Sequence, residues 1–328
     1  MHRPCRESVD PRRPGRLQVG SQRNRARHRL TLAALLVALL VGCKGGKGTE
    51  AAGGAPGAAV TGSAAASVNA KREAPPTSPC PEGMVPLAGG RFLRGSDRGP
   101  DAGTLDERPA REIDVAAFCL DRTEVTVESY AVCVDAGVCT KPREKDPPYA
   151  WADQFNWDKA DRKKHPVNGV SFRQAAAYCK HVGKRLPTEA EWEFAARGAS
   201  NRVHPWGKDA PGAKLLNVCD ASCRAEGLRH KLAWVAMFEE TDGFVYTAPV
   251  GSYPAGATPE GILDLEGNVG EWTEGAPCPY EKPDCGAKGN VLRGSTWLDQ
   301  FKGEVRSSGR PVRTTGEGYA TSGVRCAK

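Results

Sequence analysis

The sequence predicts an α+β fold in which loops occupy a large share of the chain. Only three segments have the apolar spacing and capping residues of helices, and each of them is short. The rest of the folded part consists of short strand-like stretches separated by Gly, Pro, Asn and Asp. Twelve cysteines in 328 residues add a third observation, because disulfides stabilise loop-rich domains in oxidising compartments.

Each predicted helix begins after a hydroxyl-bearing residue that can cap it. Thr126 and Ser171 precede the first two helices, and Thr188 forms a capping box with Glu191 ahead of the third. The glycines expected to end the helices are Gly137, Gly183 and Gly198. The side chains expected to face inward are Val127, Tyr130, Ala131, Val134, Phe172, Ala175, Ala176, Cys179, Trp192, Ala195 and Ala196.

The strand-like stretches include 91–93 and 291–293. Two loops, 144–164 and 299–319, are expected to form the variable surface. Trp151, Phe155 and Trp157 in the first loop suggest a binding face, and they are equally compatible with packing against the core. The tryptophans expected in the core rather than on a ligand platform are Trp192, Trp206, Trp272 and Trp297.

The net charge of +7 belongs to the first thirty residues, which hold nine arginines against Glu7 and Asp10. From Cys43 onward the chain carries 37 basic and 37 acidic residues, so it is neutral. A basic overall composition would suggest a nucleic-acid partner, but this distribution excludes that interpretation. The chain beyond the arginine-rich start is expected to bind no nucleic acid.

The arginine-rich start leads into an apolar run over 30–41, which is too short for a membrane-spanning helix of about 20 residues. The run ends in Leu40-Val41-Gly42-Cys43, which resembles a bacterial lipobox. That resemblance implies cleavage before Cys43, lipidation of Cys43 and attachment to a membrane through the lipid. A plain secretory signal is the alternative. Lys44 after the cysteine favours the outer over the inner membrane.

Three regions follow from these patterns. Residues 1–42 are expected to be a lipoprotein signal peptide, and 43–79 a lipidated cysteine with a flexible Ala/Gly/Pro/Ser tether. The folded domain is expected over 80–328. Ten cysteines lie within it, an even number as five disulfides require. Three pairs are close neighbours in sequence and are each expected to close a local loop: Cys133–Cys139, Cys219–Cys223 and Cys278–Cys285.

Other roles for the close cysteine pairs are zinc binding and redox activity. Zinc is disfavoured by the exported context and by the absence of nearby histidines in ligand spacing. Redox activity is disfavoured because neither Cys219–Cys223 nor Cys278–Cys285 has the C-x-x-C spacing.

Several distinct sequence motifs follow one another along 80–328. They include Cys80-Pro-Glu-Gly-Met, His165-Pro-Val-Asn-Gly-Val-Ser171, Gly183-Lys-Arg-Leu-Pro-Thr-Glu-Ala-Glu-Trp192, Asp264-Leu-Glu-Gly-Asn-Val-Gly-Glu-Trp272, Arg293-Gly-Ser295 and Gly323-Val-Arg-Cys326. This series resembles the formylglycine-generating enzyme, or sulfatase-modifying factor, family. The resemblance implies a C-type-lectin-like fold with little regular secondary structure, stapled by disulfides. It also implies a Cys179–Cys326 bond, which with the three local pairs leaves Cys80–Cys119.

The resemblance further implies calcium, which prefers six to eight hard oxygen ligands on irregular backbone. The ligands expected for a first site are Asn217, Val218, Asp242 and Phe244. Those expected for a second site are Asp264, Gly267, Val269 and Glu271. Glu124 is a further candidate ligand. In the alternative interpretation, these carboxylates belong to ordinary turns and the protein surface.

The family's enzymes oxidise a cysteine of a sulfatase to formylglycine with oxygen and a Cu(I) ion held by two thiolates. The two copper positions fall at or near Leu298 and Gly303, and no cysteine occurs between Cys285 and Cys326. Leucine and glycine offer no soft anionic ligand to Cu(I). Copper is therefore not expected, and no catalytic residue is assigned.

The sequence thus favours a non-catalytic family member, a calcium-bound and lipid-anchored module that binds a protein or glycan partner at the cell envelope. The alternative function is a copper-dependent oxidoreductase that generates formylglycine in sulfatases. A carbohydrate-binding lectin is a third hypothesis, which rests on the analogy of fold alone.

Overall fold

The computed structural model describes residues 79–97, 107–144, 151–313 and 316–328. The chain divides into two units, 1–66 and 67–328, and all the described residues belong to the second unit. The predicted signal peptide and Cys43 lie outside the described residues, as does the predicted tether apart from its last residue. None of the helices in the described part has the length and apolar character needed to cross a bilayer.

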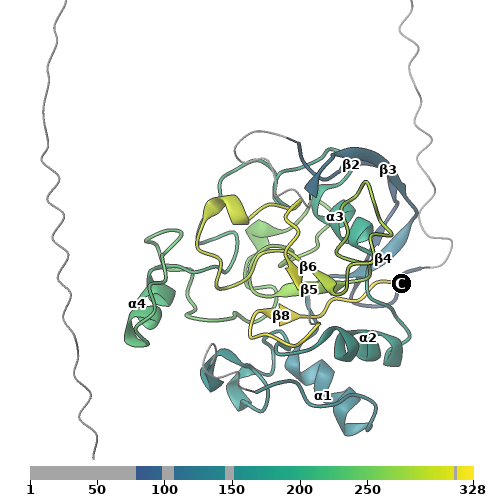
Figure 1. Cartoon of the computed structure of the whole chain (residues 1–328). Helices are drawn as coiled ribbons and strands as arrows, with labels where there is room; N and C mark the ends of the chain where they lie inside the picture. Colours follow the sequence, from purple (N-terminus) through teal and green to yellow (C-terminus); the bar gives the residue numbers. More distant parts are fainter. Residues whose placement is uncertain (1–78, 98–106, 145–150, 314–315) are drawn as a thin grey trace, which may run out of the picture. The chain divides into compact units, whose positions relative to one another are not determined.

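The structure combines short helices and short strands with long irregular connections, as the sequence predicts (Figure 1). The α-helices are α1 (Val127–Asp135), α2 (Phe172–His181), α3 (Glu189–Arg197) and α4 (Ala221–Arg229). The strands are β1 (Met84–Leu87), β2 (Gly90–Arg94), β3 (Arg111–Val115), β4 (Phe118–Asp121), β5 (Gly270–Thr273), β6 (Asn290–Arg293), β7 (Val312–Arg313) and β8 (Ser322–Gly323). Single 3₁₀ turns are η2 (Ala152–Gln154), η3 (Ala160–Arg162), η4 (Pro254–Gly256) and η5 (Lys302–Glu304).

The three predicted helices are confirmed, together with their capping residues. Thr126 accepts a hydrogen bond from the Ser129 amide at the start of α1. Full capping boxes begin the other two helices, between Ser171 and Gln174 in α2 and between Thr188 and Glu191 in α3. The caps therefore satisfy amides that have no partner within the helix itself.

The strands form three small sheets. Antiparallel pairs join β1 to β4 and β2 to β3. The third sheet has the order β7-β6-β5-β8, in which β5 and β8 run parallel while the other neighbours are antiparallel. The predicted stretches 91–93 and 291–293 lie within β2 and β6.

Helix α3 packs against the two N-terminal strand pairs (Figure 1). Phe92 of β2 meets Phe194 of α3 edge to face, with ring centroids 5.4 Å apart. Trp192 is fully buried in the same cluster. Removing these side chains from water is the main stabilising term for a domain with so few backbone ladders.

Helices α1 and α2 lie side by side on the other side of the C-terminal sheet (Figure 1). Tyr130 of α1 stacks on Tyr178 of α2 at 5.5 Å. Trp272 of β5 is fully buried in this second cluster, and its indole nitrogen donates to the Val170 carbonyl at 2.8 Å.

The structure contains five disulfides, which pair all ten cysteines of the described part: Cys80–Cys119, Cys133–Cys139, Cys179–Cys326, Cys219–Cys223 and Cys278–Cys285. These are the pairs expected from the sequence. Cys179–Cys326 spans 147 residues and ties α2 to the C-terminal strand region, whereas the local pairs close loops of 4 to 7 residues.

Helix α4 is the element that the sequence interpretation missed. Asp220 caps it by accepting from the amides of Ser222 and Cys223 at 2.8 and 3.0 Å. Its nine residues include Gly227 and have no continuous apolar face, which explains why the spacing did not reveal it. An aspartate before Ala-Ser-Cys-Arg was the available signal.

The core assignment holds for three of the four tryptophans. Trp192, Trp272 and Trp297 are buried, while Trp206 is half-buried and packs at the edge of a small apolar cluster. Phe155 in the first variable loop is also core, with 1% of its surface exposed.

Candidate functional site

The segment that follows β6 contains Leu298 and Gly303, the residues at or near which the sequence resemblance places the copper positions. Leu298 is half-buried and packs against an apolar cluster that contains Trp297. Gly303 lies exposed in the turn η5. All ten cysteines between Cys80 and Cys326 are described, and each one is in a disulfide. The described residues therefore offer no thiolate to a copper ion at this segment.

The region around α4 packs against this segment. The Cys219 amide donates to the Asp299 carbonyl at 3.1 Å, and the Val235 amide donates to the Gln300 side chain at 2.6 Å. Trp234 meets Trp297 edge to face, with centroids 5.9 Å apart. Trp297, Asp299 and Gln300 are thus engaged within the protein, whereas Phe301 is exposed.

The structure brings together the four residues predicted for a first calcium site. The Asp242 carboxylate accepts hydrogen bonds from the Val218 and Phe244 amides, both at 3.0 Å. The Asn217 amide nitrogen lies 3.4 Å from both Asp242 oxygens. The Asn217 side-chain oxygen is buried and has no hydrogen-bond partner among the described residues. A buried acceptor without a donor fits a site that a cation would complete.

Burial raises the pKa of Asp242 to about 7, and the nearby Asp220 carboxylate adds to this increase. Hydrogen bonds from Phe244 and Val218 act in the opposite direction. Asp220 itself accepts from the Asp242 amide at 2.8 Å, so it fixes the turn that carries Asp242. A divalent cation beside Asp242 would favour its ionised form.

The residues predicted for the second calcium site surround a buried ion pair. Glu271 accepts four hydrogen bonds from Arg325 and Trp192, at 2.6 to 2.9 Å, so its oxygens are occupied. Asp264 accepts from the Gly251 amide at 2.5 Å. Glu124 is 2% exposed, and neither of its oxygens has a hydrogen-bond partner among the described residues.

Burial raises the pKa of Glu124 well above its ordinary value, and the adjacent Asp264 contributes in the same direction. Burial also raises the pKa of Asp264. The nearby Arg325 lowers both pKa values, but this one arginine is shared by three buried carboxyl groups, Glu124, Asp264 and Glu271. The excess of buried negative charge fits a cation site at Glu124 and Asp264.

The backbone from Gly267 to Val269 packs tightly against the residues predicted for the first calcium site. Gly267 has a φ of +86°, and a Cβ atom there would lie 2.4 Å from the Asn217 carbonyl oxygen. The Asn268 amide donates to that same oxygen at 2.9 Å. Gly267 and Val269, whose carbonyls are predicted ligands, thus lie in a turn that contacts the first set.

Side chains alone do not provide enough ligands for either predicted calcium site. Across the described residues, no group of three or more His, Cys, Asp or Glu side chains has an arrangement that could hold a metal ion. Calcium at these positions would therefore depend on amide and carbonyl oxygens for much of its coordination.

The sequence interpretation did not single out Glu266. This side chain is buried, and one of its oxygens accepts from the Ser295 amide at 3.1 Å and from the Ser295 hydroxyl at 2.8 Å. Burial raises the pKa of Glu266 to about 7. The contact joins the 264–269 turn to the start of the segment that follows β6, a long-range pairing that spacing does not reveal.

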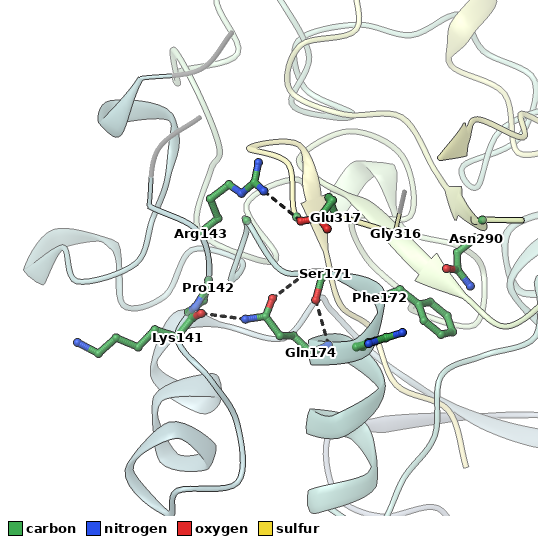
Figure 2. Close-up of a pocket in the computed structure, with 13 residues that line it drawn as sticks. Lys141, Pro142, Arg143, Ser171, Phe172, Gln174, Asn290, Gly316 and Glu317 are labelled. Atoms are coloured by element: carbon green, nitrogen blue, oxygen red, sulfur yellow. Dashed lines mark hydrogen bonds and ion pairs between the residues drawn. The ribbon is translucent and has the colours of Figure 1, made fainter. Parts of the chain in front are cut away.

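A pocket of about 670 Å³ opens beside the start of α2 (Figure 2). Ser171 and Gln174 form the capping box at its wall, and Arg143 pairs with Glu317 across it at 3.0 Å. The pocket is polar and contains none of the predicted calcium ligands or copper positions. It is a separate candidate surface for a polar ligand.

Comparison with known proteins identifies the family. Residues 70–328 match the model of the sulfatase-modifying factor enzyme 1-like domain. The chain belongs to this family. The mouse protein named inactive C-alpha-formylglycine-generating enzyme 2 is 32% identical over 285 residues, which cover 74% of this chain and 85% of that protein.

A relative whose name lacks the word inactive is similar to almost the same degree. The formylglycine-generating enzyme of Mycobacterium tuberculosis is 31% identical over 248 residues, covering 61% of this chain and 76% of the enzyme. Among solved structures, PvdO from Pseudomonas aeruginosa superposes with a TM-score of 0.58 at 25% identity, covering 74% of this chain and 93% of PvdO. The sulfatase-modifying-factor fold is thereby shown for this chain.

A buried polar network holds Thr247, three residues after Phe244. His165 Nδ1 lies 3.0 Å from the Thr247 hydroxyl, which donates to the Asn156 side chain at 3.1 Å. The Asn156 amide nitrogen donates to the Pro166 carbonyl at 2.8 Å. Burial, followed by the nearby Arg162, lowers the pKa of His165 to about 4.

We expect His165 to make the protein sensitive to acid. Its pKa is below the ordinary unfolded value of about 6.5, so the unfolded state binds the proton first and stability falls as pH drops from about 6.5 to 4. The expected loss is roughly 2 kcal/mol. Urea unfolding of the wild type and His165→Asn at pH 7 and 4.5 measures it. Equal pH dependence in both, or an imidazole that titrates near 6.5 by NMR, would contradict the prediction.

Proposed function

We propose that this chain is a non-catalytic member of the family that acts as a binding or scaffold module at the cell envelope. The observation that carries the proposal is the chemistry of the segment after Ser295. Leu298 and Gly303 stand at or near the copper positions, and every cysteine of the described part is in a disulfide. The similarity to a relative named as inactive agrees with this proposal.

The competing function is copper-dependent formylglycine formation. It would require two thiolates, and the nearest source upstream is the Cys278–Cys285 pair. Reducing that disulfide would release them, but Cys278 belongs to a loop whose carbonyl accepts from Arg310 at 2.7 Å. The loop is therefore held in place by contacts besides the disulfide.

We expect no reactive thiol and no Cu(I) site in the purified, unreduced protein. Alkylation of the denatured chain followed by peptide mass mapping should leave all cysteines from Cys80 to Cys326 unmodified. A competition assay with a coloured Cu(I) chelator should show no copper transfer to the wild type. The matched variant Leu298→Cys/Gly303→Cys tests whether the assay detects thiolates restored to this segment.

Two alkylated cysteines in the wild type, together with Cu(I) uptake, would contradict the non-catalytic proposal. Copper-dependent conversion of a sulfatase-derived cysteine peptide by the wild type would do the same. Either result would favour the oxidoreductase.

We further propose that the domain binds calcium. The first site would use the Asn217 side-chain oxygen, the Asp242 carboxylate and the Val218 and Phe244 carbonyls. The second would use Asp264, Glu124 and the Gly267 and Val269 carbonyls, beside Glu271. The unpartnered buried oxygens of Asn217 and Glu124 support these assignments.

Calcium should raise the melting temperature, because a ligand that binds only the native state stabilises it. At a free concentration of 100 times Kd, the gain is about 2.7 kcal/mol. We expect Asp242→Asn to reduce the difference between calcium and EDTA, while Asp114→Asn, an exposed control on β3, retains it. The affinity should also fall below pH 7, since a proton competes for Asp242.

Calorimetric or fluorescence melting curves in EDTA and in calcium measure this effect. Identical curves for the wild type at pH 8 would refute calcium binding. A shift of equal size in Asp242→Asn would leave no role for the first site.

We also propose that Cys43 carries a lipid anchor, which would place the domain at the envelope, at the outer membrane, with a protein or glycan partner. The supporting observations are the arginine-rich start, the apolar run and Leu40-Val41-Gly42-Cys43. Labelling with a radioactive fatty acid should be lost in Cys43→Ala. Retention of the label in this variant would exclude the anchor.

A further inference from the structure

A second, smaller pocket of about 190 Å³ lies between the β2–β3 pair, the start of α3 and the loop closed by Cys278–Cys285. Three arginines, Arg94, Arg111 and Arg310, line it together with two glutamates, Glu189 and Glu274. None of the predicted calcium ligands or copper positions contributes to this pocket. Its charged lining therefore has no assigned role.

Arg94 and Arg111 face each other across the β2–β3 ladder as directly paired residues. Directly opposite residues in an antiparallel pair project from the same face of the sheet, with their Cβ atoms about 5 Å apart. Two like charges in this position destabilise the strand pair unless a counter-charge lies between them. The cross-strand pairing therefore calls for a nearby negative group.

The protein supplies part of this counter-charge to Arg94 alone. One Arg94 nitrogen pairs with Glu189 at 3.0 Å, and its guanidinium lies 3.9 Å from the centre of the Tyr280 ring. Its Nε is buried and has no hydrogen-bond partner within the part of the chain that the structure describes. Within the same described residues, Arg111 forms no hydrogen bond or ion pair.

Glu189 cannot serve Arg111 as well. Its Oε1 accepts from Arg310 at 2.5 Å and from Arg293 at 3.4 Å, and its Oε2 accepts from Arg310 at 2.9 Å and from Arg94 at 3.0 Å. All four acceptor positions of this carboxylate are thus in use. Glu274 is an exposed residue at the wall, so the pocket keeps an excess of positive charge.

Two of the three arginines, Arg94 and Arg310, are held in place by contacts beside the pocket. Tyr280 lies between Arg94 and Arg310, whose guanidinium is 4.7 Å from the ring centre. Arg310 also donates to the Cys278 and Ala276 carbonyls at 2.7 and 3.2 Å. The disulfide Cys278–Cys285 closes the loop that supplies Tyr280 and the Cys278 carbonyl, and Ala276 lies just before this loop. Because Arg94 and Arg310 are already held in place, these two side chains lose little conformational freedom when an anion binds.

We propose that this pocket binds a phosphate group, held between the guanidinium groups of Arg94 and Arg111, which face each other across β2 and β3. A dianionic phosphate matches two unsaturated cationic groups, and guanidinium groups bind its oxygens through paired hydrogen bonds. The volume of about 190 Å³ suits one such group and part of its carrier. This ligand site is independent of the proposed envelope function, since it depends only on the residues around β2, β3 and α3.

Isothermal titration of the full chain in detergent, at constant ionic strength, tests the proposal with three probes. Inorganic phosphate represents a free ion, glycerol 3-phosphate represents a phosphate ester of a lipid or glycan, and acetate represents a carboxylate. We expect saturable binding of at least one phosphate probe and weaker binding of acetate. Tighter binding of glycerol 3-phosphate would assign the ester as the source, and tighter binding of inorganic phosphate the free ion.

The matched variants are Arg111→Gln and Arg91→Gln. Both residues are exposed on the same strand pair, and Arg91 pairs with Asp114 away from the pocket. Arg111→Gln should weaken phosphate binding about tenfold or more, while Arg91→Gln changes it less than about twofold. Circular dichroism of both variants checks that they fold.

Three results would overturn the proposal. They are the absence of saturable phosphate binding, equal binding by Arg111→Gln and the wild type, and acetate binding as tight as phosphate. General stabilisation by phosphate as a kosmotrope acts on both variants alike, so only a difference between them supports the pocket.

Discussion

The buried ion pair between Arg325 and Glu271 connects more of this fold than any single strand does. Both side chains are fully buried, and the guanidinium contacts the carboxylate at 2.7 to 2.9 Å. The remaining donors reach the carbonyls of Asp121 and Leu263, and Glu271 also accepts from Trp192. One arginine thus ties β4, the 264 turn, β5 and α3 together. Removing one partner of such a pair would leave a buried charge, at a typical cost of about 3–5 kcal/mol.

Short-range features of the fold were readable in the sequence because their causes lie within a few residues. Thr188 and Glu191, three positions apart, predict a capping box, and the structure has it. Ser171 was predicted as a cap, and the structure adds a full box with Gln174. Helix α4 was not predicted because it packs against distant residues such as Trp297, and its own apolar residues do not have helical spacing. The family motifs supplied the long-range order that spacing could not.

The candidate sites also include residues that the sequence predicted and residues that only the structure reveals. Asn217 and Asp242 were placed together by resemblance, and the structure brings them to within 3.4 Å. The free oxygens of Glu124, the Glu266–Ser295 contact and the opposed Arg94 and Arg111 emerge only when segments far apart in sequence meet. These groups stand out because a hydrogen-bond partner is missing or because a distant residue lies opposite them. A single sequence does not encode that information in any local pattern.

The position of Cys80 has a mechanical consequence. Its disulfide joins it to Cys119 in β4, and Cys119 exchanges two backbone hydrogen bonds with Lys328 at 2.8 and 2.9 Å. A pull on the chain from its N-terminal side therefore reaches β4 through a covalent bond. This force reaches β4 without first separating β1 from β4. The load is carried where the two ends of the domain meet, and the polypeptide between them, including both candidate calcium sites and the phosphate pocket, lies outside the direct line of force.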